Sequence, residues 1–386
     1  MPPSVTHEAP EDPPDQVVTS SKPRDSHGWD GKLRIVPKQA VLANPEALTD
    51  PDYSDPENVS VPVEQIEADE DLLDDYPVDA EDIDLVHCRI SSIPALRLER
   101  FTRLERLCLR QNQISEPNLP SSLGASLLEL DLYDNLISHI KGFDELLKLA
   151  SLDLSFNKIK HIKHVNHLKQ LRELYFVQNR IQKIENLDGL DRLTMIELAA
   201  NRIRDIENLE TLTALEELWL GKNKITEIKN LDLLTNIRLL DIKSNRLTAI
   251  SGLRSLANLE ELYVSHNAIT SISGLESNSQ LRILDISNNQ ISKLENLSHL
   301  THLEEFWASS NQLSSFQEVE QELRDKAELE TVYFEGNPLQ TQGPAVYRNK
   351  VRLALPQVQQ IDASKLSFPT SDWLLSDASP AFVRVS

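Results

Sequence analysis

Residues that could support catalysis are present in this 386-residue sequence, but none are arranged for it. His161, His164 and His167 lie three residues apart, a spacing that could place metal ligands on one face. We expect them instead to be solvated positions of a turn. The only two cysteines, Cys88 and Cys108, are too few for a zinc module or a disulfide-stapled scaffold. The motifs GxxxxGKS/T, GxSxG and HExxH do not occur, so we expect a non-enzyme without cofactor or metal.

Aromatic and acidic residues recur at a nearly constant interval along the chain, and these could support binding. The recurring positions, called the concave row below, are Cys108, Asp131, Asp153, Tyr175, Glu197, Trp219, Asp241, Tyr263, Asp285, Trp307 and Tyr333. Aligned Trp and Tyr are typical of the centres of protein interfaces. Carboxylates between them suit a folded partner that presents Lys and Arg. We expect the partner-binding residues to be Asp153, Tyr175, Glu197, Trp219, Asp241, Tyr263, Asp285, Glu305, Trp307 and Tyr333.

The elements that must position this row are set by a repeat. Eight consecutive steps between asparagines, from Asn135 to Asn311, are 22 residues each. Around every one of these asparagines lies the frame LxxLxLxxNxI, as in the segment from Leu215 to Ile225. This frame is the short form of the leucine-rich repeat. It predicts an α/β-type repeat solenoid: a horseshoe with a concave parallel sheet, 22-residue coils and a C-terminal cap.

The frame also assigns a role to each of its positions. Side chains alternate along a strand, so the two leucines that lie two apart point into the core, and the residue between them faces the concave side. We expect the asparagine to bond buried backbone groups that the turn leaves unpaired. Apolar residues at every third position, such as Ile225, Ile228, Leu231 and Leu234, favour a 3₁₀-like or irregular turn on the convex side.

The two ends of the chain differ from the repeats. Residues 1–84 hold 22 acids and 5 bases and are rich in proline, which predicts a disordered tail over residues 1–76. We expect the solenoid over 77–340, with about 11 to 12 coils, a cap over 341–363 and an extension over 364–386. Cys88 takes the asparagine position of a degenerate first coil, where we expect it to be a small buried hydrophobe.

Charge and hydropathy limit the classes of partner. The chain has 39 basic and 61 acidic residues, a net charge of −22, which argues against neutralisation of nucleic-acid phosphates. The N-terminus lacks the features of a signal peptide, and no apolar run approaches the ~18 residues of a membrane span. We therefore expect a soluble intracellular protein with no nucleic-acid or membrane partner.

Particular segments make the resemblance more specific. The segments LEELWLGKNKI, LEEFWASSNQL and LETVYFEGNPL, together with the cap YRNKVRLALPQVQQIDA, resemble the leucine-rich-repeat regulatory subunit of type 1 protein phosphatase. The similarity covers about residues 77–363. That family often has Phe where this chain has Tyr175 and Trp219.

The resemblance implies a regulatory subunit that binds the phosphatase catalytic subunit through its concave face and controls its activity, maturation or location. It also implies nuclear and cytoplasmic location, an association with mitosis, and a phosphatase inhibitor protein as a further partner. Two alternatives stay open. One is an assembly scaffold in an RNA–protein particle, and the other is an axonemal or tubulin-associated repeat protein.

Overall fold

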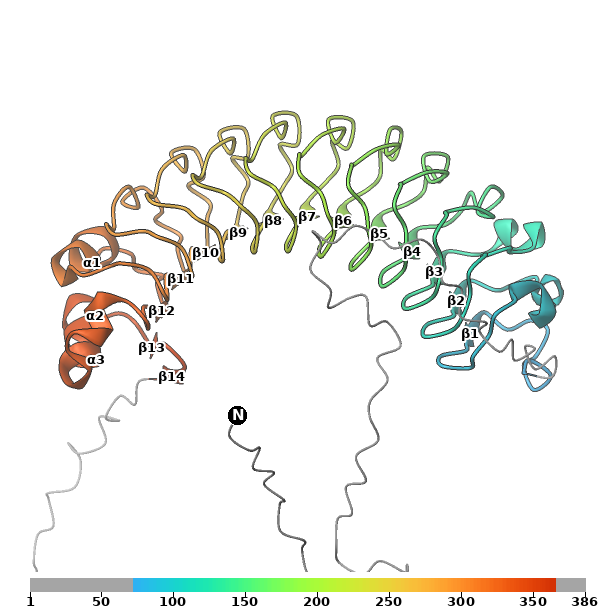
Figure 1. Cartoon of the computed structure of the whole chain (residues 1–386), viewed down its shortest axis with the longest axis horizontal. Coiled ribbons are helices and arrows are strands. Elements are labelled where there is room, and N and C mark those ends of the chain that lie inside the picture. The colour runs from blue at the N-terminus through green and yellow to red at the C-terminus, as the bar shows by residue number, and fades with distance from the viewer. Residues whose placement is uncertain (1–71, 366–386) are drawn as a thin grey trace, which may run out of the picture. The chain divides into compact units, whose positions relative to one another are not determined.

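Residues 72–365 are described by the computed structural model. They form one curved solenoid, with the strands on its inner side and turns on its outer side (Figure 1). The proposed tail up to residue 71 and the extension from residue 366 lie outside the described residues. The composition places residues 72–76 in the tail, but they lie within the described part, and Leu73 is buried in the core at 1% exposure.

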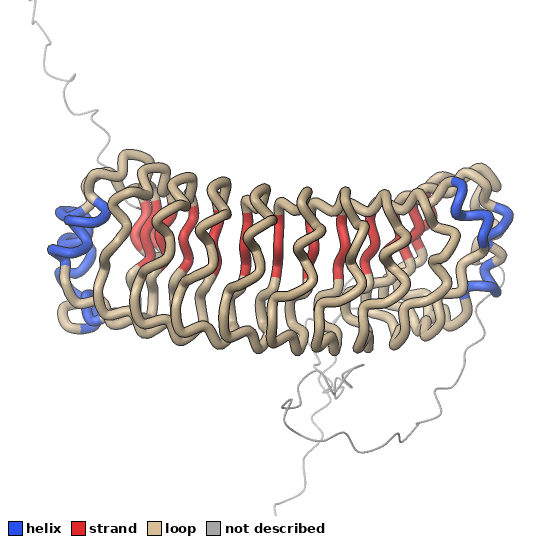
Figure 2. The backbone as a smooth tube through the Cα atoms, turned by 90° about the horizontal axis from the view of Figure 1, so that it is seen from above, coloured by secondary structure: helices blue, strands red, loops and turns tan. Residues whose placement is uncertain are grey.

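The described residues contain a single sheet of fourteen strands that follow one another in chain order. Twelve of them have three residues and pair in parallel, one per coil, as Figure 2 shows along the length of the solenoid. Their bounds are β1 Asp82–Asp84, β2 Arg106–Cys108, β3 Glu129–Asp131, β4 Ser151–Asp153, β5 Glu173–Tyr175, β6 Met195–Glu197, β7 Glu217–Trp219, β8 Leu239–Asp241, β9 Glu261–Tyr263, β10 Ile283–Asp285, β11 Glu305–Trp307 and β12 Thr331–Tyr333. The expected horseshoe with a concave parallel sheet is therefore confirmed.

The asparagine at the fixed position of each repeat joins neighbouring coils. Asn223 Nδ2 donates to Leu198 O of the preceding coil at 2.9 Å and to Leu220 O of its own coil at 3.0 Å. Its Oδ1 accepts from Ile203 N at 3.0 Å. The same bonds recur from Asn112 to Asn311, so the expected asparagine ladder is confirmed.

A second set of asparagines, which we did not predict, stabilises the convex turns. The backbone angle φ is between 56° and 62° at each of them: Asn186, Asn208, Asn230 and Asn296. Each donates its Nδ2 to an isoleucine carbonyl of the preceding coil, as Asn208 does to Ile184 O at 2.7 Å. Gly252 occupies the same position in a later coil, with φ of 70°. The position requires a left-handed backbone, which Asn and Gly adopt most readily.

Substitution of Asn208 by alanine is expected to destabilise the solenoid by about 1 kcal/mol, since alanine keeps the left-handed strain and loses the bond to Ile184 O. Asn208→Gly is the matched control, because the chain itself uses glycine at this turn. We expect a smaller loss for glycine than for alanine in chemical denaturation. An alanine variant as stable as wild type would contradict the stabilising role of these convex-turn asparagines.

The C-terminal end departs from the regular coil. The spacing from Asn311 to Asn337 is 26 residues, and the helix α1, Phe316–Leu323, occupies this longer convex segment. Our expectation of irregular turns is therefore wrong for this coil. Ser315 begins the helix by accepting from Glu318 N at 3.2 Å. Glu318 in turn accepts from Leu294 N of the preceding coil at 3.0 Å, so α1 binds to the solenoid through polar as well as apolar contacts.

Beyond β12 the chain closes the core with α2, Pro338–Thr341, and α3, Pro344–Ala354. Strand β13, Gln360–Ile361, then pairs parallel with β12, and β14, Ser364–Lys365, turns back antiparallel. Tyr347 of α3 is buried and donates to Asp362 Oδ2 at 3.0 Å. The expected C-terminal cap is present, and it extends the sheet as well as covering its end.

Short 3₁₀ helices form the connections between the first strands at the N-terminal end of the solenoid. They are η2 Ile93–Leu96, η3 Leu98–Arg100 and η4 Ser121–Ala125. In the degenerate first coil, Ile83 and Ile90 are fully buried, as the frame predicts. Cys88 is half-buried against the core rather than fully buried.

Candidate protein-binding surface

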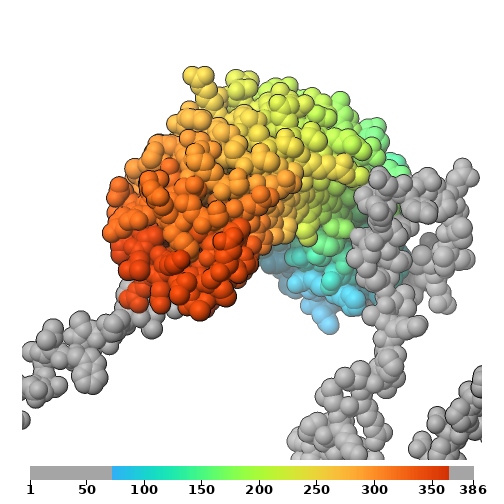
Figure 3. Space-filling model, turned by 60° about the vertical axis from the view of Figure 1, so that its left-hand side comes forward, coloured from blue at the N-terminus to red at the C-terminus, as the bar shows by residue number. Residues whose placement is uncertain are grey.

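The concave row lies on adjacent strands in perfect register. Tyr175 pairs with Glu197, Glu197 with Trp219, and Trp219 with Asp241 along the sheet. The core residue between each pair of surface positions, such as Leu218, is fully buried and fixes the strand. The surface formed by these strands faces the hollow of the solenoid, seen between its two ends in Figure 3. Eight of the ten expected binding residues are half-buried there, and Asp241 and Asp285 are buried.

The strands β4 to β11 alternate between two kinds of sequence. Four of them read Glu-x-aromatic: β5, β7, β9 and β11. The four between them end in a carboxylate: β4, β6, β8 and β10. These eight strands together carry eight acidic residues and no basic residue. The strands that carry these rings are therefore every second one, about 10 Å apart for a strand spacing near 4.8 Å.

The glutamate of each Glu-x-aromatic strand holds the ring beside it. Trp219 Nε1 donates to Glu217 Oε2 at 3.1 Å, and Trp307 Nε1 donates to Glu305 Oε2 at 3.0 Å. Tyr263 donates its hydroxyl to Glu261 Oε2 at 2.7 Å. Because the polar edge of each ring is already bonded within the strand, what the ring offers a partner is mainly its apolar face. Glu305 was expected to bind the partner, and here it also orients Trp307.

Near the C-terminal end the rings touch one another. The Trp307 ring lies 6.2 Å from that of Tyr263 and 5.7 Å from that of Tyr333, both edge to face. Tyr333 is fixed further by Gln360 of β13, whose Nε2 donates to the Tyr333 hydroxyl at 2.8 Å. These three residues, called the aromatic cluster below, form a pre-ordered apolar patch. Little side-chain entropy would be lost when a partner covers it.

Two of the expected binding residues lie beneath the surface. Asp241 is 2% exposed and Asp285 6% exposed. Asp285 Oδ1 accepts from Ser287 N at 2.9 Å, and Asp241 Oδ1 accepts from Lys243 N at 3.0 Å. Asp241 Oδ2 also pairs with Lys243 Nζ at 2.6 Å. Both carboxylates therefore stabilise the turn after their strand and present little surface for direct contact.

The surroundings of Glu197 destabilise its charged carboxylate, in contrast to those of Asp241 and Asp285. Burial raises the pKa of its carboxyl, and the nearby charges of Asp153 and Asp241 raise it further. Lys243 offsets these effects only in part. The middle of the concave surface thus holds carboxylates that repel one another in the free protein. A cation placed there by a partner would relieve that repulsion.

Glu197→Gln is expected to stabilise the fold at pH 7, by no more than about 1 kcal/mol for a half-buried surface group. The raised pKa means that the folded chain holds this proton more tightly than the unfolded chain does. The wild-type fold therefore becomes less stable as the pH rises above 4.5, the ordinary pKa of a glutamate. The advantage of glutamine should therefore disappear near pH 4, as measured by thermal unfolding.

Glu276→Gln is the control, because backbone N–H groups, including that of Gly274, lower the pKa of this exposed carboxyl. Its substitution should not stabilise the fold at pH 7. A lower thermal midpoint for Glu197→Gln than for wild type at pH 7 would contradict the proposed repulsion.

Residues considered for catalysis or metal binding do not come together within residues 72–365. No group of three or more His, Cys, Asp or Glu side chains in this part could hold a metal ion. His161 pairs with Glu185 at 3.1 Å at the surface, while His167 bonds Phe143 O at 3.0 Å. Cys108 lies half-buried in the concave row, and burial raises its thiol pKa to about 11, which disfavours a reactive thiolate.

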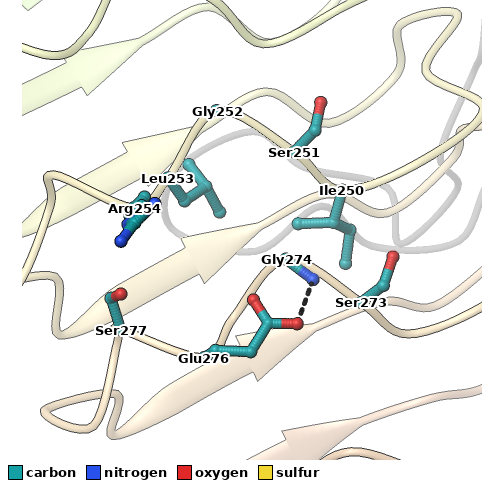
Figure 4. A pocket seen from close by; sticks show the side chains of 9 residues that line it. All are labelled: Ile250, Ser251, Gly252, Leu253, Arg254, Ser273, Gly274, Glu276 and Ser277. Atoms are coloured by element: carbon teal, nitrogen blue, oxygen red, sulfur yellow. Dashed lines mark hydrogen bonds between the residues drawn. The ribbon is translucent and has the colours of Figure 1, made fainter.

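The convex turns also form an open hollow, shown in Figure 4. It lies between the turns that follow β8 and β9 and contains Gly252, Arg254, Gly274 and Glu276. The Glu276 side chain is bonded to Gly274 N at 3.1 Å and so caps its own turn. The lining holds no arrangement of acid, base and nucleophile. Within residues 72–365 there is also no helix with the length and hydropathy of a membrane span.

Known sequences include a family model and two yeast proteins that are similar to the repeats of this chain. A family model described as "Leucine Rich repeats (2 copies)" matches residues 169–211, 191–233, 235–277 and 279–324. The chain is 51% identical over 98 residues to the protein phosphatase 1 regulatory subunit SDS22 of Saccharomyces cerevisiae, and 58% identical over 87 residues to that of Schizosaccharomyces pombe. These stretches cover 25% and 22% of this chain, and 29% and 25% of the two yeast proteins.

Solved structures agree with the fold. An internalin of Listeria monocytogenes superposes with a TM-score of 0.61 at 24% identity, covering 74% of this chain and 87% of the internalin. At that identity the likeness concerns the fold alone. The sequence matches, in contrast, confirm the specific resemblance that the repeat segments suggested. The described residues form a leucine-rich-repeat solenoid, and about a quarter of the chain is similar in sequence to the yeast regulatory subunits of protein phosphatase 1.

Proposed function

We propose that this protein is a non-catalytic regulatory subunit that binds the catalytic subunit of type 1 protein phosphatase through its concave surface. The observation that carries the proposal is the concave row itself, where ordered aromatic rings alternate with carboxylates on a rigid sheet. The sequence similarity to two phosphatase regulatory subunits supports the choice of partner.

The concave surface suits a folded partner for three physical reasons. The aromatic cluster supplies the buried apolar area that dominates interface energies. The six half-buried or exposed carboxylates of β4 to β11 are complementary to a basic patch and would speed association. Small side chains, such as Ser265 and Gly221, follow the strands and leave room for the partner to approach the backbone.

In this proposal the protein regulates its partner by binding and positioning it, and catalyses no reaction itself. The solenoid would hold the catalytic subunit and so control its activity, maturation or location, with the metal ions and the catalytic groups belonging to the partner. A phosphatase inhibitor protein could join the complex on surfaces that the concave row leaves open. We associate this role with the nucleus and cytoplasm and with mitosis, as the family resemblance implies.

Isothermal titration of the full chain with purified phosphatase catalytic subunit tests the partner. We expect saturable binding at one catalytic subunit per chain, weakened by added salt because the surface is acidic. Absence of measurable heat, together with separate elution of the two proteins in size-exclusion chromatography, would overturn the choice of partner and favour one of the scaffold alternatives.

A further inference from the structure

One side of the solenoid carries a concentration of positive charge that is opposite to the charge of the whole chain. The residues one before, one after and three after the ladder asparagine alternate with buried positions, so they point away from the core. Over the five coils from Asn157 to Asn245 these are fifteen positions, with eight bases and no acid. The bases, called the basic flank below, are Lys158, Lys160, Arg180, Arg202, Arg204, Lys222, Lys224 and Arg246.

The coils hold these bases in a fixed line. Arg202 N donates to Ile181 O, Lys224 N to Ile203 O and Arg246 N to Ile225 O, each at 2.8 Å. Equivalent residues of successive coils therefore lie side by side along the flank, roughly one strand spacing of 4.8 Å apart. All eight side chains are partly or fully exposed.

The charges of the basic flank are mostly unneutralised. Arg180 has a partner and is not counted here. The other seven make no ion pair or side-chain hydrogen bond with any residue of the described range 72–365. Elsewhere in the same solenoid, bases are commonly paired, as Arg238 is with Glu260 at 2.9 Å and Lys229 with Asp205 at 2.8 Å. The flank is thus a line of bases in a chain of net charge −22 that its own described surface does not neutralise.

We propose that the basic flank binds an extended acidic segment of a partner protein. The charge fits a polyanion, and the geometry distinguishes between polyanions. The flank adjoins the carboxylates of the concave row, which would repel the wide, highly charged backbone of a nucleic-acid duplex. An extended peptide is narrow enough to contact the flank alone. Of the fifteen positions only Phe156 is aromatic, so this surface lacks the series of stacking rings that single-stranded nucleic-acid binders use.

The uncharged positions of the flank add hydrogen-bonding groups for such a peptide. Gln178, Gln182, Thr226, Ser244 and Thr248 lie among the bases. This surface lies beside the concave row but shares no residue with it, so it provides a second docking site whether or not the partner of the concave row is a phosphatase. A protein held on the concave sheet by its basic face could at the same time place an acidic segment on the flank.

Fluorescence anisotropy of a labelled 20-residue oligoglutamate with the full chain tests the proposal. We expect saturable binding that weakens steeply with salt. The triple variant Arg202→Glu, Lys224→Glu and Arg246→Glu should lower the affinity at least tenfold, and neutralisation of the same residues to Gln should have an intermediate effect. Circular dichroism should show unchanged folding for both, because these side chains make no ion pair or side-chain hydrogen bond within residues 72–365.

The matched control reverses three exposed bases away from the flank, Lys148→Glu, Arg172→Glu and Arg254→Glu, with the same change in net charge. It should alter the affinity less than twofold. Failure of the full chain to bind oligoglutamate, or an equal loss in both triple variants, would overturn the proposal. Tighter binding of a 20-nucleotide oligouridylate than of oligoglutamate would assign the flank to nucleic acid instead.

Discussion

Trp307→Ala is expected to weaken binding of the phosphatase catalytic subunit by about 2 kcal/mol or more, close to 30-fold in Kd. The ring lies between Tyr263 and Tyr333, and its Nε1 is bonded to Glu305. Truncation would remove the centre of the aromatic cluster and free its two neighbours to move. The partner would then lose apolar contact and would meet a less ordered surface.

Isothermal titration calorimetry of the variant measures this loss. Trp219→Ala should act in the same direction, since its ring is held in the same way by Glu217. Leu233→Ala is the control: this leucine is 60% exposed, lies on the convex side of the same coil as Trp219 and should not contribute. If both tryptophan variants bind within twofold of wild type, the concave surface is not the interface.

The second large effect concerns the fold. Asn223→Ala is expected to destabilise the solenoid by roughly 1–3 kcal/mol, the cost of a buried polar group left without its partner. Ile203 N would lose its acceptor, Asn223 Oδ1 at 3.0 Å. The carbonyls are affected less, since Leu198 O also accepts from Asn201 and Leu220 O also accepts from Asn245.

Lys222→Ala is a control at the adjacent position. Lys222 is exposed and has φ of 54°, a strain that lysine and alanine share, so the substitution should change stability little. Thermal unfolding should therefore separate the two variants by several degrees. Equal midpoints would contradict the ladder as a source of stability.

The asparagine ladder also shows why so much of the fold is readable from sequence. The coils between Asn135 and Asn311 repeat the same 22 positions, so one strand centre, such as Leu218, identifies the others. The core, the strands and the outward row follow from the alternation of side chains along a strand. Periodicity could not reveal the insertion of α1, because the step from Asn311 to Asn337 breaks the period there.

The site is less readable than the fold, because its details depend on contacts between neighbouring side chains. The sequence placed Asp285 on the concave row, but its burial depends on how the turn and the neighbouring rings pack over it. The recurring Glu-x-aromatic pattern of the strands could have predicted the hydrogen bond between Glu217 and Trp219. The basic flank was equally visible as bases beside the ladder asparagine, once the coils were known to stack.

Site-specific photocrosslinking tests the central claim most directly. Benzoylphenylalanine would replace Trp219 in the concave row or, as the matched position on the convex side, Leu233. In a mixture with the phosphatase catalytic subunit, we expect a crosslink from position 219 and none from position 233. A crosslink from position 233 alone, or a complex that forms without any crosslink from position 219, would contradict binding through the concave surface.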